Sequence, residues 1–244
     1  MAPPFLKGGK KLKSKNNIKI NLYNIIMFKI VSIEGNIGSG KSTLLENLRK
    51  HYKDNDSIIF LREPVDEWEK IKDVEGNTML KKFYSDTAKY SFAFQMMAYI
   101  SRLKILRDTI KSLDPTKEYI IITERSLYTD RYVFSEMLYD DNKIEDVCYE
   151  IYLNWFDEFV QDFPIAYSIY VKTSPDKCYE RIHIRAREGE ELIQLSYLKV
   201  CHKYHEEFLE HINTKQLILD GNQNIYKNEP IVEEWLHQIN QFIL

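Results

Sequence analysis

Residues 33–43, IEGNIGSGKST, combine three glycines with a lysine and several hydroxyl side chains. The segment matches the phosphate-loop pattern G-x-x-x-x-G-K-[ST], in which glycines let backbone N–H groups wrap around phosphates. We therefore expect a nucleoside triphosphate here, with Lys41 bridging its outer phosphates and the Ser42 hydroxyl ligating Mg²⁺. The expected phosphate-binding residues are Gly35, Asn36, Gly38, Ser39, Gly40, Lys41, Ser42 and Thr43.

Acidic and basic side chains follow two apolar segments further along the chain. Arg62–Glu63 follows residues 57–61, Glu124–Arg125 follows residues 118–123, and Asp130–Arg131 comes soon after. Helix caps and surface ion pairs would account for one such group. Because the carboxyl ends of parallel strands meet at one edge of a sheet, we expect all three groups beside the phosphate loop.

A long helical pattern carries polar and aromatic side chains together. Gln95 and Arg102 are seven residues apart, which places them on one helix face two turns from each other. Phe94 adjoins Gln95. Most aromatic side chains on such a helix pack in the core, but a carboxamide and a guanidinium among aromatic rings suit a planar, hydrogen-bonding ligand. A nucleobase is such a ligand.

Three arginines, Arg181, Arg185 and Arg187, lie near the end of another predicted helix. Arg181 and Arg185 share a face because they are one turn apart. Their planar guanidinium groups are suited to closing over phosphates and stabilising charge that develops during transfer. The spacing alone leaves open whether they form such a lid or a solvated charged face.

The elements that position these residues alternate between strands and helices. Short apolar segments rich in β-branched residues predict strands at 28–33, 57–61, 118–123, 165–171 and 216–220. Helical patterns lie between or after them, at 41–52, 87–112, 144–161, 175–186, 195–211 and 229–242. This alternation predicts an α/β fold with a doubly wound parallel five-stranded sheet flanked by helices, whose ligands bind at the carboxyl ends of the strands.

The charge is unevenly distributed along the 244 residues. Residues 1–26 contain six lysines and no acid, whereas the remaining chain has 28 basic and 37 acidic side chains. We expect a flexible basic tail over residues 1–26 and one domain over residues 27–244. An acidic body of this kind argues against a general nucleic-acid binder. The tail itself has three interpretations: a solvated appendage, the product of an upstream translation start, or a targeting segment.

Cysteine usage and hydropathy bear on the compartment. Cys148, Cys178 and Cys201 show neither a CxxC pair nor metal-like spacing, which indicates structural thiols in a reducing environment. No apolar run approaches the length needed to cross a bilayer, so no membrane partner is expected. The expected location is cytoplasmic. A mitochondrial location would follow if the tail were a targeting segment, although it lacks the arginines typical of one.

Six blocks in order resemble the deoxynucleoside kinases, particularly the deoxycytidine/deoxyguanosine/deoxyadenosine branch. They are IEGNIGSGKST, REPVDEW (62–68), YSFAFQ (90–95), SRLKILRD (101–108), ERSLYTDRYVF (124–134) and RIHIRAREGEE (181–191). The resemblance covers residues 28–244 and implies a P-loop NTPase-type fold with an arginine-rich lid. It also implies phosphorylation of a deoxynucleoside 5′-hydroxyl for nucleotide salvage, with Mg²⁺ and with ATP, UTP or another triphosphate as donor.

The resemblance further implies a role for each site residue. Glu63 corresponds to the general base, Arg125 to the arginine that orients it, and Glu124 to the acid that holds Mg²⁺ with Ser42. Gln95 corresponds to the residue that reads the base edge. The remaining nucleoside-binding positions are the stacking rings Phe94 and Phe134, the walls Ile37, Trp68 and Leu80, and the 3′-hydroxyl ligands Tyr84 and Glu190. Arg181, Arg185 and Arg187 match the lid arginines, and Gln223, Asn224 and Ile225 match the loop that contacts the donor base.

Two positions bear on the choice of base. Arg102 and Asp130 match the arginine and aspartate of the cytidine/purine branch, and such a pair favours an exocyclic amino group and crowds a 5-methyl group. We therefore expect deoxycytidine, deoxyadenosine or deoxyguanosine, with thymidine disfavoured. Phe83 departs from the methionine usual at its position, which leaves the ranking among the three open.

Two alternatives keep the same fold. A monophosphate kinase of the thymidylate kinase type needs no carboxylate base, so Glu63 argues for a nucleoside acceptor. A non-catalytic subunit, like the related accessory subunit of respiratory complex I, would not need Lys41, Ser42, Glu63 and Arg125, yet all four are present. The family resemblance also implies a homodimer through the long helices 87–112 and 144–161.

Overall fold

The computed structural model describes residues 27–223 and 229–244. The predicted tail, residues 1–26, and the donor-loop residues Asn224 and Ile225 lie outside the described residues.

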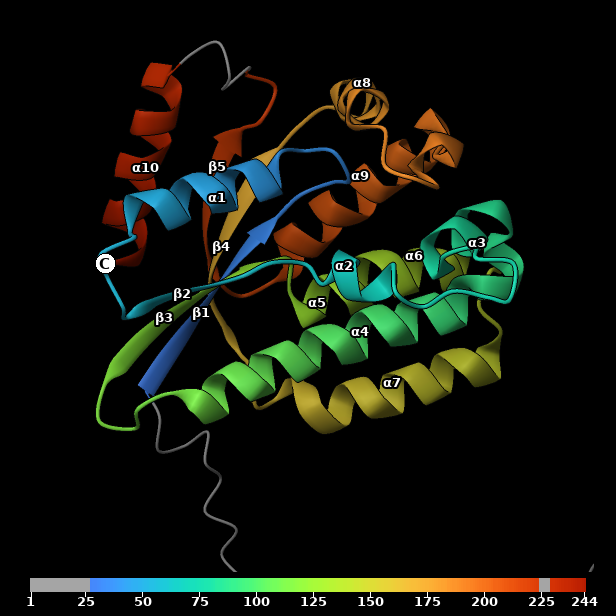
Figure 1. The fold of residues 1–244 in the computed structure, drawn as a ribbon, viewed down its shortest axis with the longest axis horizontal. Coiled ribbons are helices and arrows are strands. Elements are labelled where there is room, and N and C mark those ends of the chain that lie inside the picture. Colours follow the sequence, from blue (N-terminus) through green and yellow to red (C-terminus); the bar gives the residue numbers. More distant parts are fainter. Residues whose placement is uncertain (1–26, 224–228) are drawn as a thin grey trace, which may run out of the picture.

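A five-stranded parallel sheet forms the centre of the molecule (Figure 1). Its strands are β1 (Met27–Glu34), β2 (Ile58–Leu61), β3 (Glu118–Glu124), β4 (Ile165–Lys172) and β5 (Lys215–Asp220). They lie in the order β2-β3-β1-β4-β5, and every neighbouring pair is parallel. All five predicted strands are confirmed to within one or two residues, because continuous apolar, β-branched segments are what a sheet buried on both faces requires.

Successive residues of each strand point to opposite faces, and each face has its own helical layer. On one face Val31 and Ile33 pack with α1 (Lys41–His51) and α10 (Glu229–Ile243). On the other face Ile30 packs with α4 (Thr87–Ser112) and α7 (Asp146–Val160). Figure 1 shows these two layers on either side of the sheet. The doubly wound arrangement predicted from the sequence is therefore confirmed.

The remaining helices gather toward the carboxyl ends of the strands (Figure 1). Two of them were predicted, α8 (Pro175–Arg185) and α9 (Leu195–His211). The short ones were not: α2 (Val65–Trp68), α3 (Met79–Ser85), α5 (Leu127–Thr129), the π-helical segment η2 (Asp130–Ser135), α6 (Glu136–Asp140) and the 3₁₀ turn η3 (Glu190–Leu192). One or two helical turns give no periodicity that a sequence pattern can reveal.

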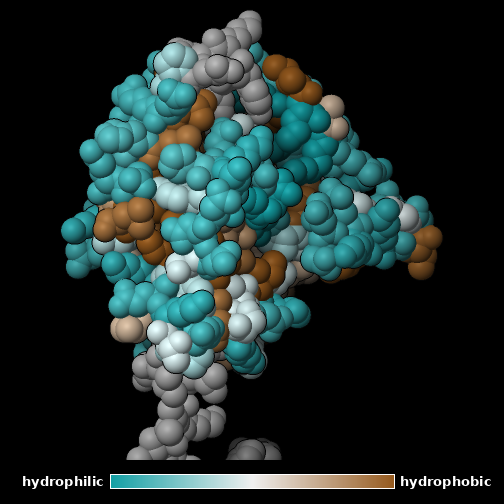
Figure 2. Space-filling view, turned by 60° about the vertical axis from the view of Figure 1, so that its left-hand side comes forward, coloured by the Kyte–Doolittle hydropathy of each residue, from teal (hydrophilic) through white to brown (hydrophobic). Residues whose placement is uncertain are grey.

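The surface shows no large apolar belt on the face drawn in Figure 2, where hydrophilic residues predominate and hydrophobic ones form separate patches. Within the described part of the chain, no helix is both long and apolar enough to cross a membrane.

Candidate active site

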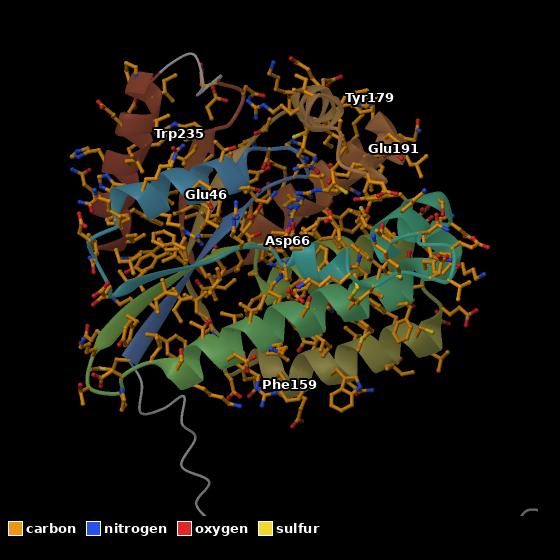
Figure 3. All side chains as sticks on the ribbon, viewed as in Figure 1. Glu46, Asp66, Phe159, Tyr179, Glu191 and Trp235 are labelled. Atoms are coloured by element: carbon orange, nitrogen blue, oxygen red, sulfur yellow. The ribbon has the colours of Figure 1, made fainter. Side chains whose placement is uncertain are left out.

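A cavity of about 680 Å³ opens at the carboxyl ends of the strands. Elements far apart in sequence contribute to it, including Asp66 of α2 and Trp235 of α10, both labelled in Figure 3. The predicted site residues that line it are Ile37, Gly38, Ser39, Gly40, Lys41, Ser42, Thr43, Glu63, Trp68, Leu80, Phe83, Tyr84, Phe94, Gln95, Glu124, Arg125, Asp130, Phe134, Arg181, Arg185, Arg187, Glu190 and Gln223. One cavity thus brings together nearly all the residues that the sequence singles out.

Three predicted residues lie behind the cavity wall. Asn36 is buried, and its amide Nδ2 donates to the carbonyl of Leu198 at 2.8 Å while its Oδ1 accepts from the Ile37 N–H at 2.8 Å. The side chain of Asn36 therefore braces the loop against α9. Gly35 and Arg102 are also absent from the lining, and both contribute to the wall through hydrogen bonds to residues that do line it.

The phosphate loop connects β1 to α1, as its pattern requires. Gly38 adopts a φ of +78°, and a Cβ there would lie only 2.6 Å from the carbonyl oxygen of Cys178, so this position accepts only glycine. Gly40 precedes the first residue of α1 and leaves the N-terminal end of that helix facing the cavity. This end of a helix favours anions because its backbone N–H groups are unpaired.

Lys41 is buried, and its ammonium group donates to the carbonyl of Asn36 at 2.8 Å. Burial, and next the positive charge of Arg125, lower the pKa of Lys41 from 10.5 to about 7. The charged form of Lys41 is therefore disfavoured in the free protein, chiefly by burial. A bound polyanion would favour the charged form.

Ser42 and Glu124, the two residues expected to hold Mg²⁺, lie in contact with each other. The Ser42 hydroxyl donates to Glu124 Oε1 at 2.5 Å, at the point where α1 begins and β3 ends. Hydroxyl and carboxylate oxygens fit Mg²⁺, which takes few protein ligands beside substrate phosphates. In the described residues no group of three or more His, Cys, Asp or Glu side chains is placed to hold a metal by itself.

Glu63 lies after β2 and is held by two arginines at the same oxygen. Arg102 Nη2 donates to Glu63 Oε1 at 3.0 Å, and Arg125 Nε donates to it at 3.2 Å. Burial would raise the pKa of Glu63, but Arg125, Arg102 and Lys41 outweigh it and lower the pKa to about 2. Glu63 is therefore an ionised carboxylate at any physiological pH.

Arg125 connects three parts of the site. It adopts a left-handed conformation with a φ of 64°, a strain of about 1 kcal/mol that residues at functional sites often carry. Its N–H donates to the Ile33 carbonyl at 2.9 Å, and its Nη1 donates to the Gly35 carbonyl at 2.7 Å. The guanidinium also lies 4.8 Å from the ring centre of Phe134. The arginine thereby joins Glu63 to the phosphate loop.

Arg102 and Asp130 form a buried ion pair. Arg102 Nε donates to Asp130 Oδ2 at 2.9 Å, and Nη1 donates to the Glu124 carbonyl at 2.6 Å. Asp130 faces the cavity from the π-helical segment η2, which also presents Phe134. The sequence did not reveal that Arg102 contacts Glu63 as well, so one guanidinium links the base-reading region to the carboxylate.

Aromatic rings form the apolar end of the cavity. Phe83 stacks on Phe94 with ring centres 4.5 Å apart and an interplanar angle of 13°. Trp68 meets Phe94 edge-on at 5.6 Å and donates its indole N–H to Ser101 Oγ at 2.8 Å. Phe83 therefore occupies one face of Phe94 and fixes the orientation of its ring.

The three arginines expected to form a lid donate hydrogen bonds to oxygen atoms of the protein in this structure. Arg181 donates to the carbonyls of Ser39 and Gln223, both at 3.1 Å. Arg185 contacts both oxygens of Glu190, at 2.7 and 2.6 Å, and Arg187 donates to Glu190 Oε1 at 3.2 Å.

Tyr84 also lines the cavity near Glu190. Burial, and next the charge of Glu190, raise the pKa of Tyr84, so its hydroxyl remains protonated and able to donate.

Two of the six charged residues after the strands are not placed as expected. Arg131 pairs with Glu136 at 2.8 Å and lies over the ring of Tyr149, away from the cavity lining. Arg62 reaches the cavity edge, but half its side chain is exposed and it pairs with Glu46 at 3.0 Å. Adjacent residues point in different directions, so a run of charges does not show which of them faces a site.

Tyr197 and His205 are among the residues of this region that the sequence patterns did not single out. Tyr197 of α9 lines the cavity and meets Tyr84 edge-on, with ring centres 6.2 Å apart. His205, also on α9, is fully buried, and its Nε2 lies 3.3 Å from Arg125 Nη1. A lone histidine in an amphipathic helix carries no sequence signal that would have identified it.

The chain is similar in sequence to several known proteins. The family model described as "Deoxynucleoside kinase" matches residues 31–244. Probable deoxycytidine kinase of fowlpox virus is 38% identical over 188 residues, covering 76% of this chain and 73% of the relative. Mitochondrial thymidine kinase 2 of Macaca fascicularis is 33% identical over 182 residues, covering 74% and 64%. Deoxycytidine kinase 2 of Gallus gallus is 32% identical over 241 residues, covering 87% and 89%.

Proposed function

The chain belongs to the deoxynucleoside kinase family, and we propose that it transfers the γ-phosphoryl group of ATP, UTP or another nucleoside triphosphate to the 5′-hydroxyl of a deoxynucleoside. The observation that carries this proposal is the ionised Glu63, held by Arg125 and Arg102 at the edge of the phosphate loop. Phosphorylation of free deoxynucleosides would serve nucleotide salvage. A monophosphate acceptor is not favoured, since it has no need of a carboxylate base.

Glu63 accepts the proton of the 5′-hydroxyl in the proposed mechanism. Both arginines donate to Oε1, so the proposal assigns Oε2 to the hydroxyl. A pKa near 2 makes Glu63 a weak base before reaction. A weak base suffices because phosphoryl transfer has a loose transition state in which the hydroxyl loses its proton late. Its main contribution is then to orient the oxygen in line with the phosphorus.

The donor is held by the phosphate loop, with Lys41 on its outer phosphates. Mg²⁺ would be held by Ser42 and Glu124 and would neutralise charge on the phosphate oxygens. Arg181, Arg185 and Arg187 are proposed to stabilise the transferring group from the opposite side. Because Arg185 and Arg187 hold Glu190 here, the proposal implies that they share their donors between Glu190 and phosphate.

The nucleoside is proposed to lie between the aromatic rings and the polar wall. Gln95 reads the base edge, and Tyr84 and Glu190 bind the 3′-hydroxyl. The relatives carry names with different bases, so overall identity does not indicate which base is preferred. The buried Arg102–Asp130 pair supports an amino-bearing base: deoxycytidine, deoxyadenosine or deoxyguanosine over thymidine.

The quaternary structure proposed is a homodimer built on α4 and α7, which lie side by side (Figure 1). Val147, Ile151 and Trp155 are spaced four residues apart on one face of α7 and are 63, 42 and 48% exposed. Ile100 of α4 is 41% exposed as well. Three large apolar side chains in one exposed row support an interface there.

The catalytic unit proposed comprises residues 27–244, and residues 1–26 are proposed to be dispensable for catalysis. The three cysteines are free thiols, which supports a cytoplasmic, reducing location. A chain truncated before Met27 with undiminished activity would support the first point. Imaging of the full chain tests the second, with mitochondrial import as the contradicting result.

One assay tests the function as a whole. The purified chain is given each of the four deoxynucleosides and their monophosphates, with ATP or UTP and Mg²⁺. Phosphorylation of amino-bearing deoxynucleosides at the 5′ position is expected. Activity on monophosphates alone, or no transfer to any acceptor, would overturn the proposal.

A further inference from the structure

His205 is a buried titratable residue to which the mechanism above gives no role. It lies in the third turn of α9, is fully buried, and meets the ring of Phe134 edge-on at 5.8 Å. Both ring nitrogens have partners. Nδ1 lies 2.7 Å from the Cys201 carbonyl oxygen, and Nε2 lies 3.3 Å from Arg125 Nη1.

The chemistry of these partners fixes the protonation of the ring. A carbonyl only accepts, so Nδ1 must carry a hydrogen; a guanidinium only donates, so Nε2 must offer a lone pair. His205 is therefore the neutral Nδ1–H tautomer. Burial, and next the charge of Arg125, hold its pKa well below the usual 6.5, which keeps the ring in this form.

We propose that His205 is a positioning residue for phosphoryl transfer: its Nε2 accepts a hydrogen bond from Arg125 and so fixes the guanidinium against Glu63 and the phosphate loop. This inference rests on the proposed kinase function. His205 does not line the cavity, so it acts through Arg125 and not on substrate.

Three acceptors from three parts of the fold hold the Arg125 side chain. Glu63, after β2, accepts a hydrogen bond from Nε. The Gly35 carbonyl, in the loop after β1, and His205 Nε2, on α9, both accept from Nη1. A guanidinium is planar, so contacts at two edges set both its position and its plane. Removing the α9 contact leaves Nη1 with the Gly35 carbonyl alone among these acceptors, so the plane of the guanidinium is held less firmly and its contact with Glu63 weakens.

A second contact shows that α9 serves as a support for this region. The amide of Asn36 donates to the Leu198 carbonyl at 2.8 Å, so the same helix holds the phosphate loop directly. The His205 contact lies two helical turns further along α9. The helix thus fixes the loop and the arginine relative to each other.

The test compares His205→Phe, which keeps a ring but removes the acceptor, with His205→Gln, whose amide oxygen can still accept from Arg125. His211→Phe is the matched control. His211 makes the same contact to a carbonyl one turn back, with Nδ1 2.7 Å from the Glu207 oxygen, but lies on the exposed side of α9. The His211→Phe variant loses the contact with the Glu207 carbonyl and leaves the Arg125 region unchanged.

We expect His205→Phe to lower kcat by about tenfold or more, as loss of a hydrogen bond to a charged group implies, with little change in the nucleoside KM. His205→Gln should keep kcat within about threefold of the parent, and His211→Phe should be unchanged. In an Arg125→Lys background, His205→Phe should have little further effect, because the contact is already absent. Equal activities of the parent and both His205 variants would overturn the proposal.

A spectroscopic readout on the unsubstituted protein does not depend on activity or on the stability of a variant. ¹⁵N shifts of labelled histidine should show one ring with protonated Nδ1 and bare Nε2 that does not titrate between pH 5.5 and 8.5. A titrating ring, or the opposite tautomer, would contradict the proposal. Failure of the kinase function would instead show as absence of transfer by the parent chain, whatever the tautomer.

Discussion

Arg125 Nε lies 3.2 Å from Glu63 Oε1, across a gap of 62 residues in the sequence. This contact joins the end of β2 to the end of β3, and Arg125 continues it to the phosphate loop through the Gly35 carbonyl. The same guanidinium therefore contacts both the proposed base and the proposed donor site.

Donor binding should take up a proton near neutral pH. Burial and Arg125 lower the pKa of Lys41 to about 7, so above pH 7 the free protein holds it mostly neutral, while a triphosphate favours the charged form. At pH 8 binding of a non-hydrolysable donor should take up nearly one proton, and at pH 6 nearly none. Calorimetry in buffers of different ionisation enthalpy measures this. Lys41→Met should abolish the uptake, and an uptake that survives in that variant would refute the assignment.

Replacing Arg102 with Met and Asp130 with Ala should raise thymidine phosphorylation relative to deoxycytidine. The pair is buried and would no longer demand an amino group or crowd a 5-methyl group. Total kcat should fall, because Arg102 also holds Glu63. Competition between the two nucleosides in one reaction measures the ratio. Lys104→Met, on the exposed side of α4, is the control, and an unmoved ratio in the double variant would count against the specificity argument.

Phe83→Met should shift preference toward the larger purine deoxynucleosides. The substitution removes a ring stacked at 4.5 Å on Phe94 and frees space at the apolar end of the cavity. Stability should fall by about 1 kcal/mol, since the position is fully buried and stacked. Ratios of kcat/KM for deoxyadenosine and deoxyguanosine against deoxycytidine provide the measurement. A change in melting temperature with constant ratios would assign Phe83 to packing alone.

Trp155→Glu should convert the proposed dimer to a monomer. The side chain lies in the exposed apolar row of α7, where a buried charge without a partner would cost several kcal/mol. Sedimentation velocity gives the oligomeric state. Val200→Glu places the same charge on an exposed apolar position of α9 and should leave the state unchanged. A parent chain that sediments as a monomer would contradict the interface.

Sequence patterns predicted the strands, the long helices and the phosphate loop because each depends on local chemistry. Glycine is required at position 38 because of its positive φ and its close approach to Cys178, and the glycine-rich loop sequence shows this requirement directly. Contacts between segments far apart in the sequence give no local pattern from which they could be predicted. The link from Arg102 to Glu63, the bracing role of Asn36 and the contact of His205 with Arg125 all arise only when helices pack against the sheet.

The charged pairs after the strands show the same limit. Glu63, Glu124 and Asp130 reach the cavity as predicted, whereas Arg131 turns to Glu136. Asp130 and Phe134 both face the cavity from the π-helical segment. A stretch of six residues with wider turns is not visible in an apolar pattern, so the sequence located these residues without revealing how they are presented.

The most direct test of the account is the Glu63→Gln substitution. The amide oxygen can still accept from Arg125 and Arg102, which places the amide NH₂ group where Oε2 faces the substrate. An NH₂ group neither takes the hydroxyl proton nor accepts the hydrogen bond that orients the hydroxyl. Glu67→Gln, an exposed glutamate four residues on, is the control. With saturating donor, kcat for deoxycytidine should fall at least about a hundredfold, while the nucleoside dissociation constant changes only a few-fold. Near-normal kcat in Glu63→Gln would contradict the assignment of Glu63 as the base.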